Sequence, residues 1–127
     1  MRTVLALALL LITTAASASP LPDFTYNGKT YTADTDALEL WADSGLTARE
    51  WSGQRERLMD AVEGQLSRTY RRGGWPATNA KVYLGTKYHP LLAYRVAWEY
   101  SQLNWQAGLF EDADGMYVAV WWAEFAE

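Results

Sequence analysis

The pattern of apolar and polar positions predicts a β-hairpin followed by a short helix in the region after residue 20. Residues 24–32 are mostly β-favouring and surround Asn27-Gly28, a dipeptide that tolerates the positive φ angles of a tight hairpin turn. Residues 34–43 are predicted to form a short helix, because Asp36 can cap its start and Gly45 can end it.

A long amphipathic helix is predicted from Thr47 to about Arg72. Thr47 and Glu50 have the spacing of a capping box, in which each side chain accepts a hydrogen bond from the backbone N–H of the other residue. Gly73 then stops the helix. Between these ends one face is apolar, because large apolar residues recur at helical spacing: Trp51, Leu58, Met59, Val62, Leu66 and Tyr70.

The C-terminal half predicts strands and contains one ambiguous segment. Residues 81–84, 105–110 and 116–125 have the composition of strands, and a short acidic turn separates the last two. Residues 93–101 alternate at strand period, yet Pro90 is also suited to the first position of a helix. The alternation favours a strand over residues 93–101.

These elements together predict one α+β domain over residues 19–127. An N-terminal β-hairpin is followed by a long amphipathic helix, which packs on a C-terminal antiparallel sheet of three to four strands. The 109 residues of this region are close to the usual size of one domain.

Residues 1–18 have the pattern of a cleavable signal peptide. Arg2 gives a positive start, residues 4–12 are an unbroken apolar run, and residues 16–18 are small, as a cleavage site requires. The apolar run is too short for a membrane-spanning helix, which needs about 20 residues. We therefore expect cleavage after Ala18, a secreted or periplasmic location, and no membrane span in the mature form.

Composition and charge narrow the classes of partner. The chain has no cysteine, so disulfides cannot stabilise it, while seven Trp, eight Tyr and three Phe supply large rings for a core and for a surface. Charge is divided along the sequence: residues 19–48 carry net −4, residues 49–95 net +5 and residues 96–127 net −6. This balance argues against nucleic-acid binding, and complementary segments within one fold explain it.

No catalytic residue, metal site or cofactor site is predicted. His89 is the only histidine, and the motifs typical of hydrolases, zinc enzymes and nucleotide-binding proteins are absent from the sequence. Asp112 and Asp114 precede Gly115, but a calcium-binding loop would need oxygen ligands where Phe110 and Trp121 stand.

An aromatic surface is the best candidate for a binding site. Adjacent residues of a strand point to opposite faces, so we expect Trp121 and Tyr117 to share the sheet face away from the long helix, with Trp98 joining them from a neighbouring strand. Arg71 and Arg72, at the end of the long helix, are further candidates for ligand contacts.

The sequence thus favours an exported, non-catalytic binding domain with a protein or glycan ligand on an aromatic sheet face. One alternative is a small glycosidase-like hydrolase that uses Glu99 and Glu124, since a glycosidase needs a pair of carboxyl groups. The other is a structural envelope protein that forms a homodimer through the same face.

Overall fold

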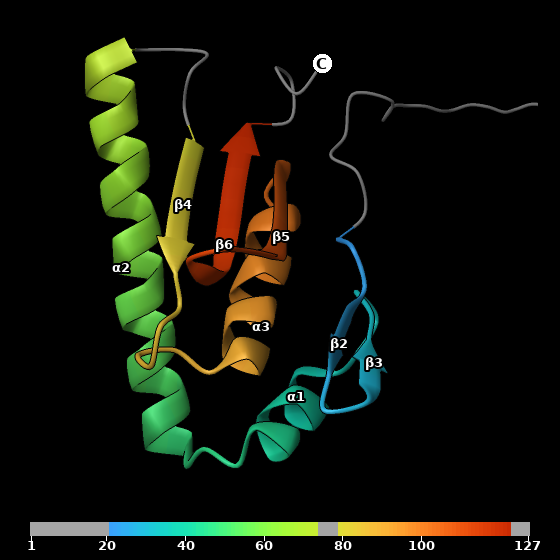
Figure 1. Cartoon of the computed structure of the whole chain (residues 1–127). Coiled ribbons are helices and arrows are strands. Elements are labelled where there is room, and N and C mark those ends of the chain that lie inside the picture. Colours follow the sequence, from blue (N-terminus) through green and yellow to red (C-terminus); the bar gives the residue numbers. More distant parts are fainter. Residues whose placement is uncertain (1–20, 74–78, 123–127) are drawn as a thin grey trace, which may run out of the picture.

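Residues 21–73 and 79–122, which the computed structural model describes, form two antiparallel sheets and three helices (Figure 1). Of residues 69–73 only the backbone is described. The α+β class and the long helix expected from the sequence are confirmed. In chain order the elements are β2 (Phe24–Tyr26), β3 (Lys29–Tyr31), α1 (Ala37–Ser44), α2 (Ala48–Gly73), β4 (Asn79–Tyr83), α3 (Pro90–Ser101), β5 (Trp105–Asp112) and β6 (Gly115–Trp122).

The N-terminal hairpin follows from the turn residues that the sequence supplies. Strands β2 and β3 pair antiparallel, and Tyr26 lies opposite Lys29 across a two-residue turn. Asn27 and Gly28 adopt φ angles of 51° and 79°, as a type I′ turn requires. The predicted hairpin is therefore confirmed.

Helix α1 is short, and both of its ends are capped. Asp36 accepts a hydrogen bond from the backbone N–H of Leu38 at 2.8 Å, which satisfies one free donor of the first turn. Gly45 ends the helix with a φ of 73°, a conformation that glycine adopts without a steric cost. Between the two caps, Leu40 is buried in the core.

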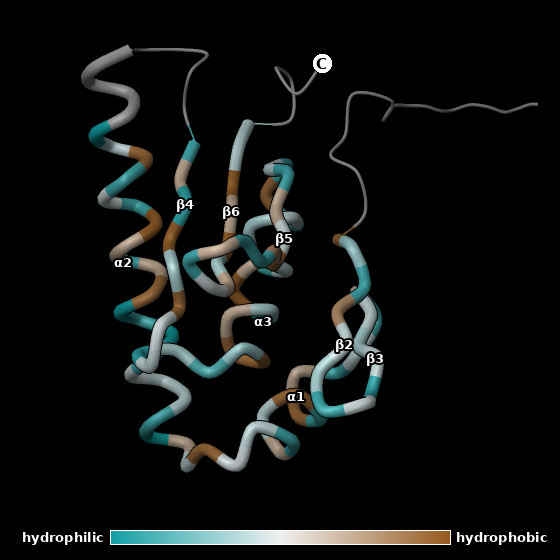
Figure 2. Tube along the Cα trace, viewed as in Figure 1, coloured by the Kyte–Doolittle hydropathy of each residue, from teal (hydrophilic) through white to brown (hydrophobic). Residues whose placement is uncertain are grey.

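Helix α2 begins with the predicted capping box. The Thr47 hydroxyl accepts from the N–H of Glu50 at 3.0 Å, and the Glu50 carboxylate accepts from the N–H of Thr47 at 2.9 Å. Leu58 and Val62 are completely buried, and the apolar segments of α2 turn toward β4 in Figure 2. The helix runs unbroken through Gly53.

The C-terminal sheet has the strand order β4-β6-β5, so the last strand in the sequence occupies the middle. Both neighbours pair antiparallel with β6. The register places Val118 of β6 between Val82 of β4 and Leu109 of β5.

The strand predicted over residues 93–101 is wrong, because this segment lies within helix α3. His89 caps α3 by accepting a hydrogen bond from the N–H of Leu91 at 3.1 Å, and Pro90 occupies the first turn. The helix packs against β5, β6, α1 and α2, so most of its circumference is buried. Its apolar residues therefore surround the helix, and no 3.6-residue period stands out in the sequence.

Helices α2 and α3 cover the same face of the C-terminal sheet. In Figure 1, α2 runs beside β4 while α3 lies behind β6 and β5. The core between these layers combines Val62 of α2, Val96 of α3 and the fully buried Val118 and Val120 of β6. We call this side of the sheet the inner face, and the opposite side the outer face.

Candidate functional site

The outer face of the C-terminal sheet carries large aromatic side chains. Since successive residues of a strand point to opposite sides, Tyr117 and Trp121 lie opposite the buried Val118 and Val120. Three rows of residues cross this face from β4 through β6 to β5: Asn79, Trp121 and Gln106; Lys81, Ala119 and Gly108; Tyr83, Tyr117 and Phe110.

Four of these rings form one continuous group, which we call the outer aromatic cluster: Tyr83, Phe110, Tyr117 and Trp121. Tyr117 is its centre, with ring centroids 5.3 Å from Tyr83 and 5.9 Å from Phe110. Phe110 lies 6.3 Å from Trp121 and connects that ring to the others. None of the four belongs to the hydrophobic core or to the residues packed against it. The cluster is therefore a surface feature in its own right.

A charged pair borders the cluster at the Tyr83 end. The Lys81 ammonium lies 3.1 Å from the Asp112 carboxylate and 4.2 Å from the centre of the Tyr117 ring. The Tyr83 hydroxyl donates to the same carboxylate at 2.6 Å. This hydrogen bond is the main reason that the pKa of Asp112 lies below its usual value and that of Tyr83 above. Cation, anion and hydroxyl thus meet beside an aromatic ring.

Gly108 determines how the Phe110 ring lies on the sheet. A Cβ atom at Gly108 would come within 2.9 Å of the Phe110 ring, so only glycine leaves room for the ring in this position. Pro22 lies on the same side, 3.5 Å from that Cβ position. The ring of Phe110 therefore covers the backbone of β5 and lies beside Trp121.

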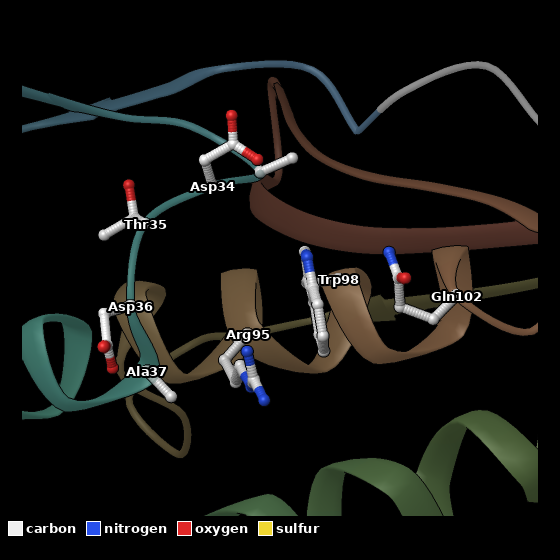
Figure 3. A pocket seen from close by; sticks show the side chains of 8 residues that line it. Asp34, Thr35, Asp36, Ala37, Arg95, Trp98 and Gln102 are labelled. Atoms are coloured by element: carbon white, nitrogen blue, oxygen red, sulfur yellow. The ribbon is translucent and has the colours of Figure 1, made fainter.

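Trp98 does not join the outer aromatic cluster, contrary to the sequence prediction. It lies on α3, where the Arg95 guanidinium stacks over its ring at 3.9 Å. Together with the loop between β3 and α1, these two side chains line a separate hollow (Figure 3).

Of the other predicted site residues, Arg71 and Arg72 lie in the last turn of α2, and their side chains are outside the description. Glu124 lies outside the described residues. Glu99 lies on α3, where its carboxylate accepts two hydrogen bonds from Arg55, at 2.9 and 2.5 Å, and approaches Arg95 at 3.7 Å. Glu99 is thus held between two arginines instead of facing an open cleft.

Sequence reasoning did not place Tyr83, Phe110, Lys81 or Asp112 on this face. For Phe110 a signal existed: a two-residue turn between Asp112 and Gly115 fixes the hairpin register and places Phe110 opposite Tyr117. For the residues of β4 there was none, because the sequence does not reveal which strand pairs with the second edge of β6.

In the ranges that the structure describes, no helix has the length and apolar character needed to cross a membrane. The same ranges contain no group of three or more Asp, Glu or His side chains positioned to hold a metal ion. No protein-family model, curated protein or solved structure compared with this chain matches it.

Proposed function

We propose that this protein is an exported, non-catalytic domain that binds a glycan on its outer aromatic cluster. One observation carries the proposal: rings from three adjacent strands form a continuous surface outside the core, with Lys81, Asp112 and the Tyr83 hydroxyl at its border. Tyr83 is exposed and the other three rings are half-buried, so part of their apolar area contacts water unless a ligand covers it, and such patches mark binding sites.

The chemistry of the cluster suits a sugar. A pyranose ring has apolar C–H faces that pack on aromatic rings and hydroxyls around its rim that need hydrogen-bond partners. Tyr117 and Trp121 supply the aromatic surface, while Lys81 donates and Asp112 accepts. Sites for small ligands commonly combine mostly apolar walls with a few polar groups in this way.

The size of the face favours a glycan over a protein partner. Five residue pairs join β4 to β6, and eight join β5 to β6. With strands about 4.8 Å apart and about 3.3 Å per residue, the face measures at most roughly 14 by 26 Å, or on the order of 360 Å². A stable protein interface buries about 800 Å² on each partner. The face is also too small to hold a homodimer by itself, whereas a short oligosaccharide fits it.

The position of the Glu99 carboxylate also favours a binding role over a hydrolase. Glycoside cleavage needs one carboxyl group that donates a proton to the leaving group. A second carboxylate, on the other side of the scissile bond, acts as nucleophile or general base. Glu99 is instead held by Arg55 and Arg95 on the far side of the sheet from the outer aromatic cluster.

Export is the part of the proposal that the signal-like pattern of residues 1–18 supports. The expected mature chain begins at Ser19. The intact mass of protein recovered outside the cytoplasm measures this directly, and a chain that retains Met1 contradicts it.

The binding proposal is tested by titrating soluble β-1,4-linked oligosaccharides of glucose and of N-acetylglucosamine, and by pull-down on insoluble peptidoglycan. Isothermal titration calorimetry is the readout for the soluble ligands, because its signal does not depend on the Trp121 ring. Trp121→Ala and Tyr117→Ala should each weaken binding about tenfold or more, as expected for an aromatic residue central to a site.

Leu38→Ala is the matched control, because Leu38 is a large exposed apolar residue on α1, away from the outer face. It should leave the affinity unchanged, and circular dichroism verifies that each variant is folded. The proposal is overturned if no saccharide binds, or if folded Trp121→Ala and Tyr117→Ala bind as the unaltered protein does. Saturable binding of a protein instead of a glycan also overturns it.

A further inference from the structure

A hollow of about 500 Å³ lies between α3 and the loop that joins β3 to α1. Arg95, Trp98 and Gln102 line it from α3, and Asp34, Thr35 and Asp36 line it from the loop (Figure 3). Its volume falls within the range of about 300–1,000 Å³ that is typical of small-molecule sites. The hollow is separate from the outer aromatic cluster, since α3 packs on the inner face of the sheet.

The wall on α3 presents a positioned cation. The Arg95 guanidinium stacks on the Trp98 ring at 3.9 Å, which fixes the plane of its nitrogen atoms. Its Nε lies 3.7 Å from Glu99, whose carboxylate is already occupied by Arg55. The terminal nitrogens of Arg95 have no hydrogen-bond partner within the described residues. A pre-oriented guanidinium edge with free donors is suited to a carboxylate.

The opposite wall presents anions. Asp36 uses one carboxylate oxygen, Oδ1, to cap α1. The Asp34 backbone N–H donates to the Thr32 hydroxyl at 3.2 Å, which holds the loop, while the Asp34 carboxylate has no partner among the described side chains. In Figure 3 both aspartates belong to the strand-to-helix loop that faces α3.

Arg95 and Asp34 carry opposite charges on the same hollow, yet no ion pair joins them across it. A ligand that carries only a negative charge would be repelled by the two aspartates, and one that carries only a positive charge would be repelled by Arg95. A ligand with both charges can satisfy both walls at once.

We propose that this hollow binds a small zwitterion of amino-acid to dipeptide size. Its carboxylate accepts hydrogen bonds from Arg95, and its ammonium group donates to Asp34 on the opposite wall. Trp98 holds the guanidinium in place and gives the ligand an apolar surface. This site does not depend on the proposed glycan site, because the two have no residue in common.

Isothermal titration calorimetry at pH 7 with the dipeptide Ala-Ala tests the proposal. N-acetyl-Ala-Ala lacks the ammonium charge, and Ala-Ala amide lacks the carboxylate. Each modification should weaken binding about tenfold or more, the value of one hydrogen bond between charged groups. Failure of Ala-Ala to bind at about 10 mM, or equal affinity for all three ligands, overturns the proposal.

Two variants assign the charges to residues. Arg95→Gln should abolish the preference for Ala-Ala over its amide while leaving the preference over the N-acetyl form. Asp34→Asn should do the reverse, and it changes only an exposed loop carboxylate, so it tests the site even if Arg95→Gln is unstable. Arg57→Gln and Asp60→Asn, exposed positions on α2, are the charge-matched controls and should bind Ala-Ala normally. If Arg95→Gln and Asp34→Asn fold and keep both preferences, the assignment is wrong.

Discussion

The two faces of the C-terminal sheet have the same backbone and opposite surroundings. On the inner face, Val118 and Val120 are completely buried under α2 and α3. On the outer face, Tyr117 and Trp121 are larger and more apolar in area, yet they stand outside the core. Side-chain size therefore does not decide what is core. The position of the two helices decides it, and the rings on the opposite side remain half-buried.

The largest expected effect comes from placing the same charge on each face in turn. Val118→Asp buries a carboxylate without a partner and should cost more than about 3 kcal/mol of unfolding free energy, a large share of the stability of a small domain. Ala119→Asp, one residue further along β6, points to the outer face and should cost under about 1 kcal/mol. Urea unfolding followed by circular dichroism compares the two. Similar losses for both variants would mean that the outer face is buried as well.

A smaller effect is expected at the start of α2, the helix that covers β4. Thr47→Ala removes the acceptor for the Glu50 N–H and should cost about 1 kcal/mol. Thr47→Ser keeps a hydroxyl at this position and should remain close to the unaltered protein. The midpoint and slope of urea denaturation measure both, and coincident midpoints for Thr47→Ala and the unaltered chain would contradict the prediction.

Because His89 caps α3, the free energy of unfolding should fall at acidic pH. Burial lowers the pKa of His89 below its ordinary 6.5, and the Nδ1 atom must be unprotonated to accept from Leu91. The unfolded chain therefore binds the proton more readily, and stability should be lower at about pH 5.5 than at about pH 7.5. Because His89 is the only histidine, His89→Asn, which retains a capping side chain, should flatten this dependence. Thermal melting at both pH values measures the change, and an equally steep dependence in the variant would refute it.

The smallest expected change in stability is on the outer face. Tyr83→Phe removes one hydroxyl from an exposed ring and should alter the unfolding free energy by less than about 0.5 kcal/mol. It also removes the hydrogen bond that chiefly keeps the pKa of Asp112 low, so that pKa should rise toward its ordinary value. NMR titration of the Asp112 carboxyl measures the shift. An unchanged Asp112 titration would show that the Asp114 backbone N–H and Lys81 keep this pKa low without Tyr83.

The parts of the fold that sequence reasoning predicted have local causes. Asn27-Gly28 specifies its turn, and the Thr47–Glu50 capping box specifies the start of α2, whatever the rest of the chain does. Helix α3 was mistaken for a strand because its causes are tertiary. Ala93 and Ala97 are completely buried in this helix, which contacts α1, α2, β2, β5 and β6.

The residues of the candidate sites also divide into those with local causes and those with tertiary causes. Alternation along one strand placed Tyr117 and Trp121 on a common face, since the period of a strand is local. The partners Tyr83 and Phe110 depend on which strands flank β6, and Trp98 was assigned to the wrong surface once α3 was taken for a strand. The hollow beside Arg95 arises where a loop meets a helix some 60 residues later in the chain, and no sequence spacing encodes such a meeting.

The central position of β6 has a consequence for how the chain is made. Among the described strands, β4 and β5 each pair with β6 alone, and β6 follows both of them in the sequence. While the ribosome is still adding residues before 115, helices can form, but the C-terminal sheet has no strand pairing and the inner face has no Val118 or Val120 to close it. If the chain is exported unfolded through a membrane channel, as proposed above, this strand order postpones the burial of the core until β6 has emerged.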